Sequence, residues 1–210
     1  MHQVKNIPTS GISYLEPLTG SPDWYWGMDY THGDLYEAEE LYRDGHRIRH
    51  NRLILVRRET GEVIEPVKAK PGQYFGAPVF SDGRPVLLLV DFPAEEIRVL
   101  AYDGDIKPIV TLPLSAVPDC YNLMLHRSPL CLTRQTGDAF QIVWPEQVSF
   151  PIAAQETFCF RAGERLYFSK WFEDPDYREE LVVRDLTGAV LAQRPGTAQT
   201  MPDGQLWTLE

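Results

Sequence analysis

Short apolar segments separated by turns make up most of this chain. Its 17 prolines and 15 glycines lie mostly between these segments. Proline and glycine interrupt helices and mark turns, so this spacing leaves little room for long helices. The pattern predicts an all-β protein whose short strands follow one another in hairpins.

The same order of strands and turns recurs at a spacing of about forty residues. The clearest copy covers residues 81–114, SDGRPVLLLVDFPAEEIRVLAYDGDIKPIVTLPL, and the most similar one covers residues 162–195. In both copies a glycine turn leads into an apolar strand, an acidic loop follows, and two further strands complete the unit. Repeats of this period built from short strands are typical of β-propeller blades.

Four units of this kind can be assigned along the chain. We expect them over residues 24–69, 73–114, 121–154 and 157–195. An N-terminal strand within residues 11–20 and a C-terminal hairpin within residues 200–210 remain. Pairing of these two pieces in one blade would close the ring and remove exposed strand edges. We predict a single domain over residues 1–210, a five-bladed β-propeller with a shared terminal blade; a four-bladed propeller and an open β-meander are the alternatives.

One segment, residues 35–42 (LYEAEELY), fits both a strand and a helix. Asp34 and Glu37 have the spacing of a capping box, the interior is rich in helix formers, and Gly45 can end a helix. The register of the repeat favours a strand, because the segment lies between a glycine turn and the apolar RLILV. We predict a strand and keep a two-turn helix as the alternative.

These copies make the chain similar to a small bacterial β-propeller over nearly its whole length. The resemblance extends to architecture, since neither the Gly-His and Trp-Asp pairs of WD40 repeats nor a kelch-like double glycine recurs in register. Propellers include scaffolds, lectins and glycosidases, so the resemblance implies a fold without one function. It also implies that the loops entering the inner strands meet, around a central channel, the loops that join second and third strands.

That face is expected to carry aromatic and charged side chains that can bind a ligand. Flat aromatic rings suit stacking on a sugar or gripping a partner, although the same rings can pack one blade against the next. Four arginines and two histidines lie within residues 43–52, and arginine binds carboxylate or phosphate through paired hydrogen bonds unless neighbouring acids neutralise it. The candidate ligand-binding residues are Trp24, Trp26, Asp29, Arg43, His46, Arg47, Arg49, His50, Asp119 and Glu156.

Charge and composition narrow the classes of partner. A net charge of −10 repels nucleic acid and anionic membranes at long range. No apolar run approaches the roughly 18 residues of a membrane span, and the N-terminus lacks a secretory-signal core, so we expect a cytoplasmic protein. Cys120, Cys131 and Cys159 match neither a zinc site nor a redox pair, and we expect buried thiols.

Signatures of catalysis do not accompany this scaffold, because the sequence contains no GxSxG, no phosphate-binding glycine loop and no HExxH. We expect no cofactor, no metal and no catalytic residue, and a binding or scaffold protein whose partner is a protein or a small polar ligand. The alternative is a glycan-active hydrolase with two channel-facing carboxylates. Cys120 with His126 is a weaker candidate for nucleophilic chemistry. The acids near inner strands are Asp29, Asp119, Glu156 and Asp203.

Overall fold

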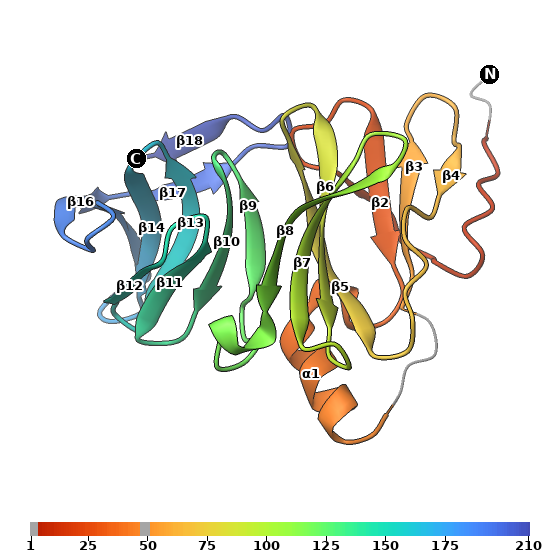
Figure 1. Ribbon diagram of the computed structural model, residues 1–210. Helices are drawn as coiled ribbons and strands as arrows, with labels where there is room; N and C mark the ends of the chain where they lie inside the picture. The colour runs from red at the N-terminus through yellow and green to blue at the C-terminus, as the bar shows by residue number, and fades with distance from the viewer. Residues whose placement is uncertain (1–3, 47–50) are drawn as a thin grey trace. The chain divides into compact units, whose positions relative to one another are not determined.

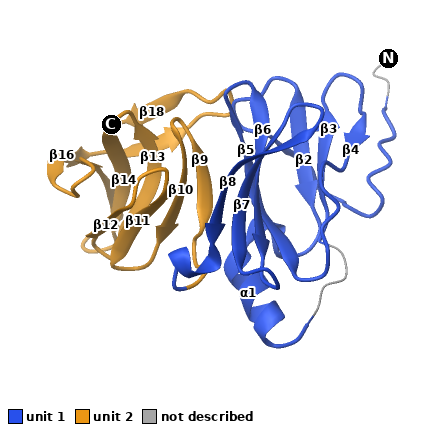
Figure 2. Ribbon diagram, in the orientation of Figure 1, with its two compact units in different colours: residues 1–118 blue, residues 119–210 orange. Residues whose placement is uncertain are grey.

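The computed structural model describes residues 4–46 and 51–210, and half of them lie in antiparallel β-sheets (Figure 1). Four sheets have four strands each and a fifth has two. The chain divides into two compact units, residues 1–118 and 119–210 (Figure 2). The prediction of an all-β protein is therefore confirmed. Within the described part of the chain, no helix is long and apolar enough to cross a lipid bilayer.

Unit 1 contains two four-stranded sheets whose strands pair in chain order. The first sheet consists of β1 (Glu16–Pro17), β2 (Trp24–Met28), β3 (Leu53–Arg57) and β4 (Val63–Ile64). The second consists of β5 (Gln73–Ser81), β6 (Arg84–Asp91), β7 (Glu96–Tyr102) and β8 (Ile106–Pro113), followed by a short 3-10 turn, η2 (Leu114–Ala116). This second sheet has the four strands expected over residues 73–114.

Unit 2 contains two more four-stranded sheets and a final hairpin. The first is formed by β9 (Met124–Arg127), β10 (Leu130–Gln135), β11 (Ala139–Trp144) and β12 (Val148–Pro151). The next is formed by β13 (Glu156–Ala162), β14 (Arg165–Phe172), β15 (Arg178–Arg184) and β16 (Val190–Pro195). The hairpin is β17 (Thr197–Thr200) with β18 (Leu206–Leu209). Both four-stranded sheets agree with the repeat units expected at residues 121–154 and 157–195.

The strand predicted over residues 35–42 is wrong, because this segment is helical. It forms α1 (Leu35–Arg43), which follows the 3-10 turn η1 (Thr31–Gly33). The Asp34 carboxylate caps the helix by accepting hydrogen bonds from the backbone N–H groups of Tyr36 (2.9 Å) and Glu37 (3.1 Å). Leu35 and Ala38 are buried on one face of the helix. Capping and an apolar face with helical spacing outweigh the register of the repeat here.

The N-terminal segment supplies the fourth strand of the first sheet, which residues 35–42 do not supply because they are helical. Sequence reasoning expects this segment to complete a blade with the C-terminal hairpin, but Glu16 and Pro17 pair with Trp26 and Tyr25 of β2. The first sheet therefore reaches four strands through β1 and not through residues 35–42. Among the described residues, β17 and β18 remain a sheet of two strands.

Apolar side chains fill the core of each unit. In unit 1, residues from β2, β3, β5 and β6 form one cluster that includes Trp26, Leu55 and Phe75. In unit 2, the rings of Phe140 and Phe168 pack edge to face with 5.2 Å between centroids, inside a cluster drawn from β10–β15. Rigid cores of this kind fix the positions of the loops that leave each sheet.

A buried amide joins the two sheets of unit 1. Asn51, which is 1% exposed, donates a hydrogen bond from Nδ2 to the backbone carbonyl of Asp29 (2.8 Å). Its Oδ1 accepts a hydrogen bond from the backbone N–H of Phe75 in β5 (2.7 Å). The Asn51 side chain thus forms hydrogen bonds with a carbonyl at the end of β2 and with a backbone N–H of the next sheet.

A second amide has the same role in unit 2. Gln135, at the end of β10, donates from Nε2 to the backbone carbonyl of Glu156 (2.7 Å). Its Oε1 accepts a hydrogen bond from the backbone N–H of Phe158 (2.9 Å). Both amides therefore supply hydrogen-bond partners to backbone groups in the first strand of the sheet that follows them in the chain.

Replacement of Asn51 by leucine should destabilise the protein strongly. Asn51→Leu leaves the Asp29 carbonyl and the Phe75 N–H buried without their partner, which costs about 2–4 kcal/mol in the free energy of unfolding. Urea unfolding followed by tryptophan fluorescence measures this loss. Gln193→Leu, on an exposed strand, is the matched control and should change stability by less than about 0.5 kcal/mol. Equal stability of the two variants would contradict the bridging role.

Removal of the α1 cap should destabilise the protein less than the loss of Asn51 does. Asp34→Ala removes both capping hydrogen bonds and should lower the free energy of unfolding by about 1 kcal/mol. Asp34→Ser retains a capping oxygen and should restore most of that loss. If Asp34→Ala unfolds at the same urea concentration as Asp34→Ser, the cap does not stabilise α1.

Candidate functional site

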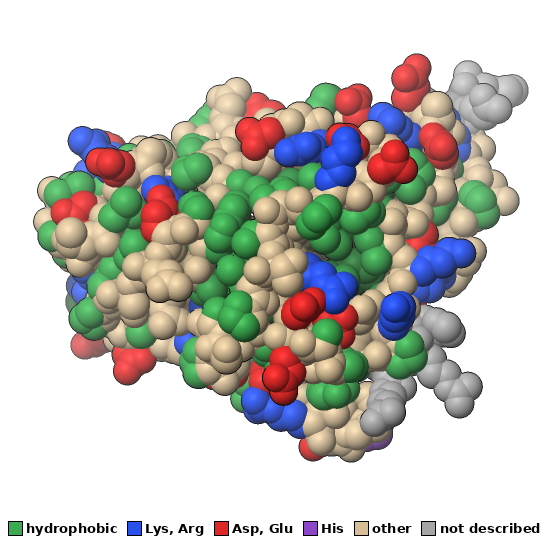
Figure 3. Space-filling view, in the orientation of Figure 1, with side chains coloured by type: hydrophobic (Ala, Val, Ile, Leu, Met, Phe, Trp, Pro, Cys, Tyr) green, Lys and Arg blue, Asp and Glu red, His purple; other side chains and the backbone are tan. Residues whose placement is uncertain are grey.

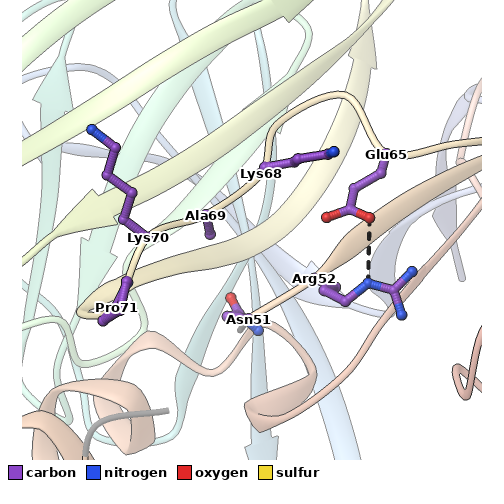
Figure 4. A pocket seen from close by; sticks show the side chains of 7 residues that line it. All are labelled: Asn51, Arg52, Glu65, Lys68, Ala69, Lys70 and Pro71. Carbon is purple, nitrogen blue, oxygen red and sulfur yellow. Dashed lines mark hydrogen bonds and ion pairs between the residues drawn. The ribbon is translucent and has the colours of Figure 1, made fainter. Parts of the chain in front are cut away.

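A cavity of about 590 Å³ opens in unit 1 beside the start of β3 (Figure 4). Its walls come from two stretches of chain, the residues just before β3 and the segment that connects β4 to β5. The lining residues are Asn51, Arg52, Glu65, Lys68, Ala69, Lys70 and Pro71.

Hydrogen bonds to the side chains of Asp29 and Gln73 fix both stretches. The Asp29 carboxylate accepts a hydrogen bond from the backbone N–H of Arg52 (2.6 Å), which holds Arg52 in place. On the opposite stretch, Lys70 and Gln73 exchange hydrogen bonds: the Lys70 N–H donates to Gln73 Oε1 (2.8 Å) and the Gln73 N–H donates to the Lys70 carbonyl (3.0 Å). Gln73 itself is buried and donates to Asp91 Oδ2 (2.6 Å). The cavity therefore has a fixed backbone frame.

The lining carries an excess of positive charge. Arg52 forms an ion pair with Glu65, with 3.3 Å between Nε and Oε2, and donates from Nη1 to the backbone carbonyl of Ser10 (2.9 Å). Lys68 and Lys70 are exposed, and within residues 4–46 and 51–210 no carboxylate forms an ion pair with either. Figure 4 shows their side chains extending in different directions from one segment. Two cations thus remain unneutralised in a chain of net charge −10.

This excess is local. Figure 3 shows that over one face of the molecule acidic and basic side chains are interspersed among apolar ones. Other basic side chains form ion pairs with neighbouring acids; Arg98, for example, lies 2.6 Å from Glu96. Neighbouring lysines without such partners attract anions more effectively than basic residues that are already paired.

Trp24 and Trp26 lie in the core of unit 1. They are 5% and 6% exposed. Trp24 packs under the guanidinium of Arg57, 4.1 Å from the ring centroid, and meets the edge of Tyr102. Trp26 stacks on His32 with 5.8 Å between ring centroids. The packing role that the sequence allows for these rings is observed, and a role in ligand binding stays a prediction.

The basic loop of residues 43–52 is described in part. Arg43 forms an ion pair with Glu39 one turn earlier in α1. His46 is exposed, and its backbone N–H donates to the Leu41 carbonyl (2.9 Å). Of the described residues of this loop, Asn51 and Arg52 line the cavity. The predicted site residues Arg47, Arg49 and His50 lie outside the described residues.

Asp119 and Glu156, the candidates in unit 2, are each held by an arginine. Asp119 Oδ1 accepts hydrogen bonds from Nη2 (2.6 Å) and Nε (3.1 Å) of the buried Arg134. Both oxygens of Glu156, which is 3% exposed, accept from Arg184 at 3.0 and 2.9 Å. Each pair compensates a buried charge of unit 2, so removal of one partner would leave the other charge buried and unpaired. That the two acids share a ligand-binding face with the basic loop stays a prediction.

Sequence reasoning missed the two lysines that define the cavity. The available signal was the stretch EPVKAKPG, residues 65–72, in which Lys68 and Lys70 stand between Pro66 and Pro71. Proline favours an extended chain, so a segment between two prolines holds both lysines on the surface and leaves their side chains free of a helix or sheet. Two neighbouring cations in an acidic protein, displayed on such a segment, were a readable pattern.

The described cysteines and His126 are unsuited to nucleophilic chemistry. Cys120 and Cys131 are buried, as expected, whereas Cys159 is half-buried. Burial raises the pKa of the Cys131 thiol to about 12 and that of Cys159 to about 11. Burial also lowers the pKa of His126 to about 4. These thiols are therefore protonated at neutral pH, and the thiolate is the reactive form.

Neither a search for metal-binding clusters among the described residues nor a comparison with known protein sequences gives a match. Among the residues that the structure describes, no three His, Cys, Asp or Glu side chains are placed to hold a metal ion. No protein-family model and no curated protein sequence matches this chain.

His126 should make stability depend on pH. Its pKa of about 4 in the folded protein lies below the value of about 6.5 in the unfolded chain, so the unfolded chain takes up the proton first. Stability should therefore fall as the pH drops from about 6.5 to about 4, by about 2–3 kcal/mol. His126→Phe, which keeps a ring against Phe158, should lose this part of the slope in urea unfolding at several pH values.

The matched control is His46→Gln, because His46 is exposed. This variant should keep the slope of the parent protein. A slope in His126→Phe as steep as in His46→Gln would show that His126 takes up a proton equally well in both states.

Proposed function

We propose that this protein is a non-catalytic binding protein, and that the cavity beside Arg52, Lys68 and Lys70 binds a small ligand with a carboxylate or phosphate group. The observation that carries the proposal is the pair of lysines without carboxylate partners on the rim of a cavity with a fixed frame. The adjacent basic loop of residues 43–52 supports it with further arginines in the sequence.

The scaffold in this proposal is a five-bladed propeller. Four antiparallel sheets with strands paired in chain order are what successive blades require, and β17–β18 is the start of a fifth. A ring of blades presents loops on one face as a preformed site. A cytoplasmic location is a further part of the proposal.

The chemistry of the cavity suits an anion. Lysine ammonium groups bind phosphate and carboxylate as point charges, and the guanidinium of Arg52 adds directed hydrogen bonds. Glu65 holds Arg52 in position until a ligand arrives, at an exposed fraction of about one quarter for both side chains. An ion pair so exposed contributes at most about 1 kcal/mol, so a ligand anion can replace it.

A binding role accounts for the acids better than hydrolysis does. A glycosidase needs two carboxyl groups facing its substrate. Here Asp29 holds the backbone of Arg52, and Glu156 is bound through both oxygens by Arg184. Asp203 accepts hydrogen bonds from the backbone and side chain of Gln205 in its turn. Each of these carboxylates already has a structural partner.

A thermal-shift titration at low salt tests the proposal. Phosphate, sugar phosphates and dicarboxylic acids are added to the purified protein, and a ligand at a hundred times its dissociation constant should stabilise it by about 2.7 kcal/mol. Lys68→Ala combined with Lys70→Ala should abolish the saturable shift and leave the unliganded protein as stable as the parent within about 0.5 kcal/mol.

The control is Lys107→Ala, which removes a lysine outside the cavity that is paired with Asp103. It should retain the full shift. A shift of the same size in the double lysine variant, or no saturable shift with any of these anions, would overturn the assignment of the cavity.

A further inference from the structure

The C-terminal hairpin is half the width of every other sheet. β17 and β18 pair with Thr197 opposite Leu209 and Thr200 opposite Leu206. A turn at Pro202–Gly204 joins them, closed by the hydrogen bond from the Gly204 N–H to the Met201 carbonyl (2.7 Å). Two-stranded sheets are marginally stable by themselves, and the other four sheets have four strands.

One face of this hairpin is packed and the other is open. Ala198 of β17 is buried with Phe160, Leu181 and Val183 of the preceding sheet, and Leu206 packs beside them. On the opposite face, Trp207 is 45% and Leu209 is 39% exposed. β17 carries the packing against β13, β14 and β15, so β18 is the outer strand of the pair.

The edge of β18 lacks the features that protect the other outer edges. β4 is two residues long. β8 contains Lys107 and Pro108, Pro151 ends β12, and Arg194 and Pro195 end β16. Short length, charge and proline all discourage a further strand from pairing. The sequence of β18, LWTL, contains neither charge nor proline.

We propose that β18 pairs antiparallel with β18 of a second copy of this chain, so that two hairpins make one four-stranded sheet across a twofold axis. A second copy is the fitting occupant because the strand count then equals that of the other four sheets. Twofold pairing of identical edges also closes on itself and leaves no further strand to recruit.

Backbone geometry fixes the register. The Met201 N–H donates to the Gln205 carbonyl (2.8 Å), so this is a hydrogen-bonded pair, and by alternation Trp207 and Leu209 also bond to β17. The backbone N–H and C=O groups of Leu206 and Thr208 therefore point away from β17. Among the described residues they have no backbone partner. An axis at Thr208 lets the two Thr208 residues exchange both hydrogen bonds.

This register also pairs the exposed apolar side chains. With Thr208 opposite Thr208, Trp207 of each copy lies opposite Leu209 of the other, in the non-hydrogen-bonded positions where side chains are closest. Two aromatic–aliphatic cross-strand pairs result, one on each side of the axis. The edge is thus complementary to itself in both hydrogen bonding and side-chain packing.

Cross-linking tests the register directly. Residues in a hydrogen-bonded antiparallel pair have Cα atoms about 5.5 Å apart, within the range that a disulfide spans. Thr208→Cys should therefore give a covalent dimer under mild oxidation, seen on non-reducing gels. Trp207→Cys is the matched control and should stay monomeric on the gel, because residue 207 faces residue 209 of the second copy. The native thiols react slowly, since burial raises the pKa of Cys131 and Cys159.

Sedimentation of the whole chain tests the association itself. The parent protein should pass from monomer to dimer between about 1 and about 200 μM, as a small interface implies. Thr208→Pro removes the donor on the outer edge without touching a bond to β17, and should stay monomeric with an unchanged melting temperature. Thr208→Ser should dimerise like the parent.

Three results would overturn the proposal: a parent protein monomeric throughout that range, a Thr208→Pro variant that is folded and still dimeric, or equal cross-linking at positions 207 and 208. If Thr208→Pro does not fold, the comparison of Thr208→Cys with Trp207→Cys and the sedimentation of the parent protein still test the proposal. None of these measurements involves the anion cavity, so the outcome is independent of the proposed ligand.

Discussion

The structure depends on hydrogen bonding of backbone groups at the points where one antiparallel sheet gives way to the next. Inside each sheet the strands satisfy one another, but a chain that passes to a new sheet brings buried donors with it. Asn51 and Gln135 meet this need with side-chain amides that accept from Phe75 and Phe158. The same arrangement at Asn51 fixes the stretch that ends in Arg52, so the cavity is a consequence of how two sheets are joined.

Sequence periodicity predicted the sheets well wherever strand, turn and strand followed each other locally. β5 to β8 are an example, since Asp82-Gly83 and Asp103-Gly104 mark two of their turns. Prediction failed where a local signal conflicted with the register of the repeat. At residues 35–42 the capping carboxylate of Asp34 and the buried pair Leu35 and Ala38 decided for helix, although the repeat called for a strand. The capping hydrogen bonds join residues that are close in sequence, whereas the register of a strand depends on partners that are distant in sequence.

The candidate site was less accessible to sequence reasoning than the fold. Arg52 belongs to the basic loop of residues 43–52 that the sequence indicates as able to bind an anion, although it is not among the candidate ligand-binding residues. Lys68 and Lys70 gain importance through their position in the same cavity as Arg52, which depends on contacts distant in sequence. The tryptophans show the converse. Trp24 and Trp26 are residues of a type that binding surfaces often contain. Side chains alternate between the two faces of β2, however, and this alternation places both rings in the core. Residue type indicates chemistry, and only packing determines exposure.

Glu65 gives the cavity a property that its cations alone would lack. Its carboxylate is tethered within 3.3 Å of Arg52, so it acts as a resident counterion with which any anion that binds Arg52 must compete. A tethered competitor is always present at the same effective concentration, whereas a dissolved ligand is not. Singly charged solutes gain little by displacing it, while a dianion that reaches Lys68 or Lys70 as well gains more than Glu65 offers. Under the proposed function, the cavity should therefore favour multiply charged ligands over the monovalent anions of the surrounding solution.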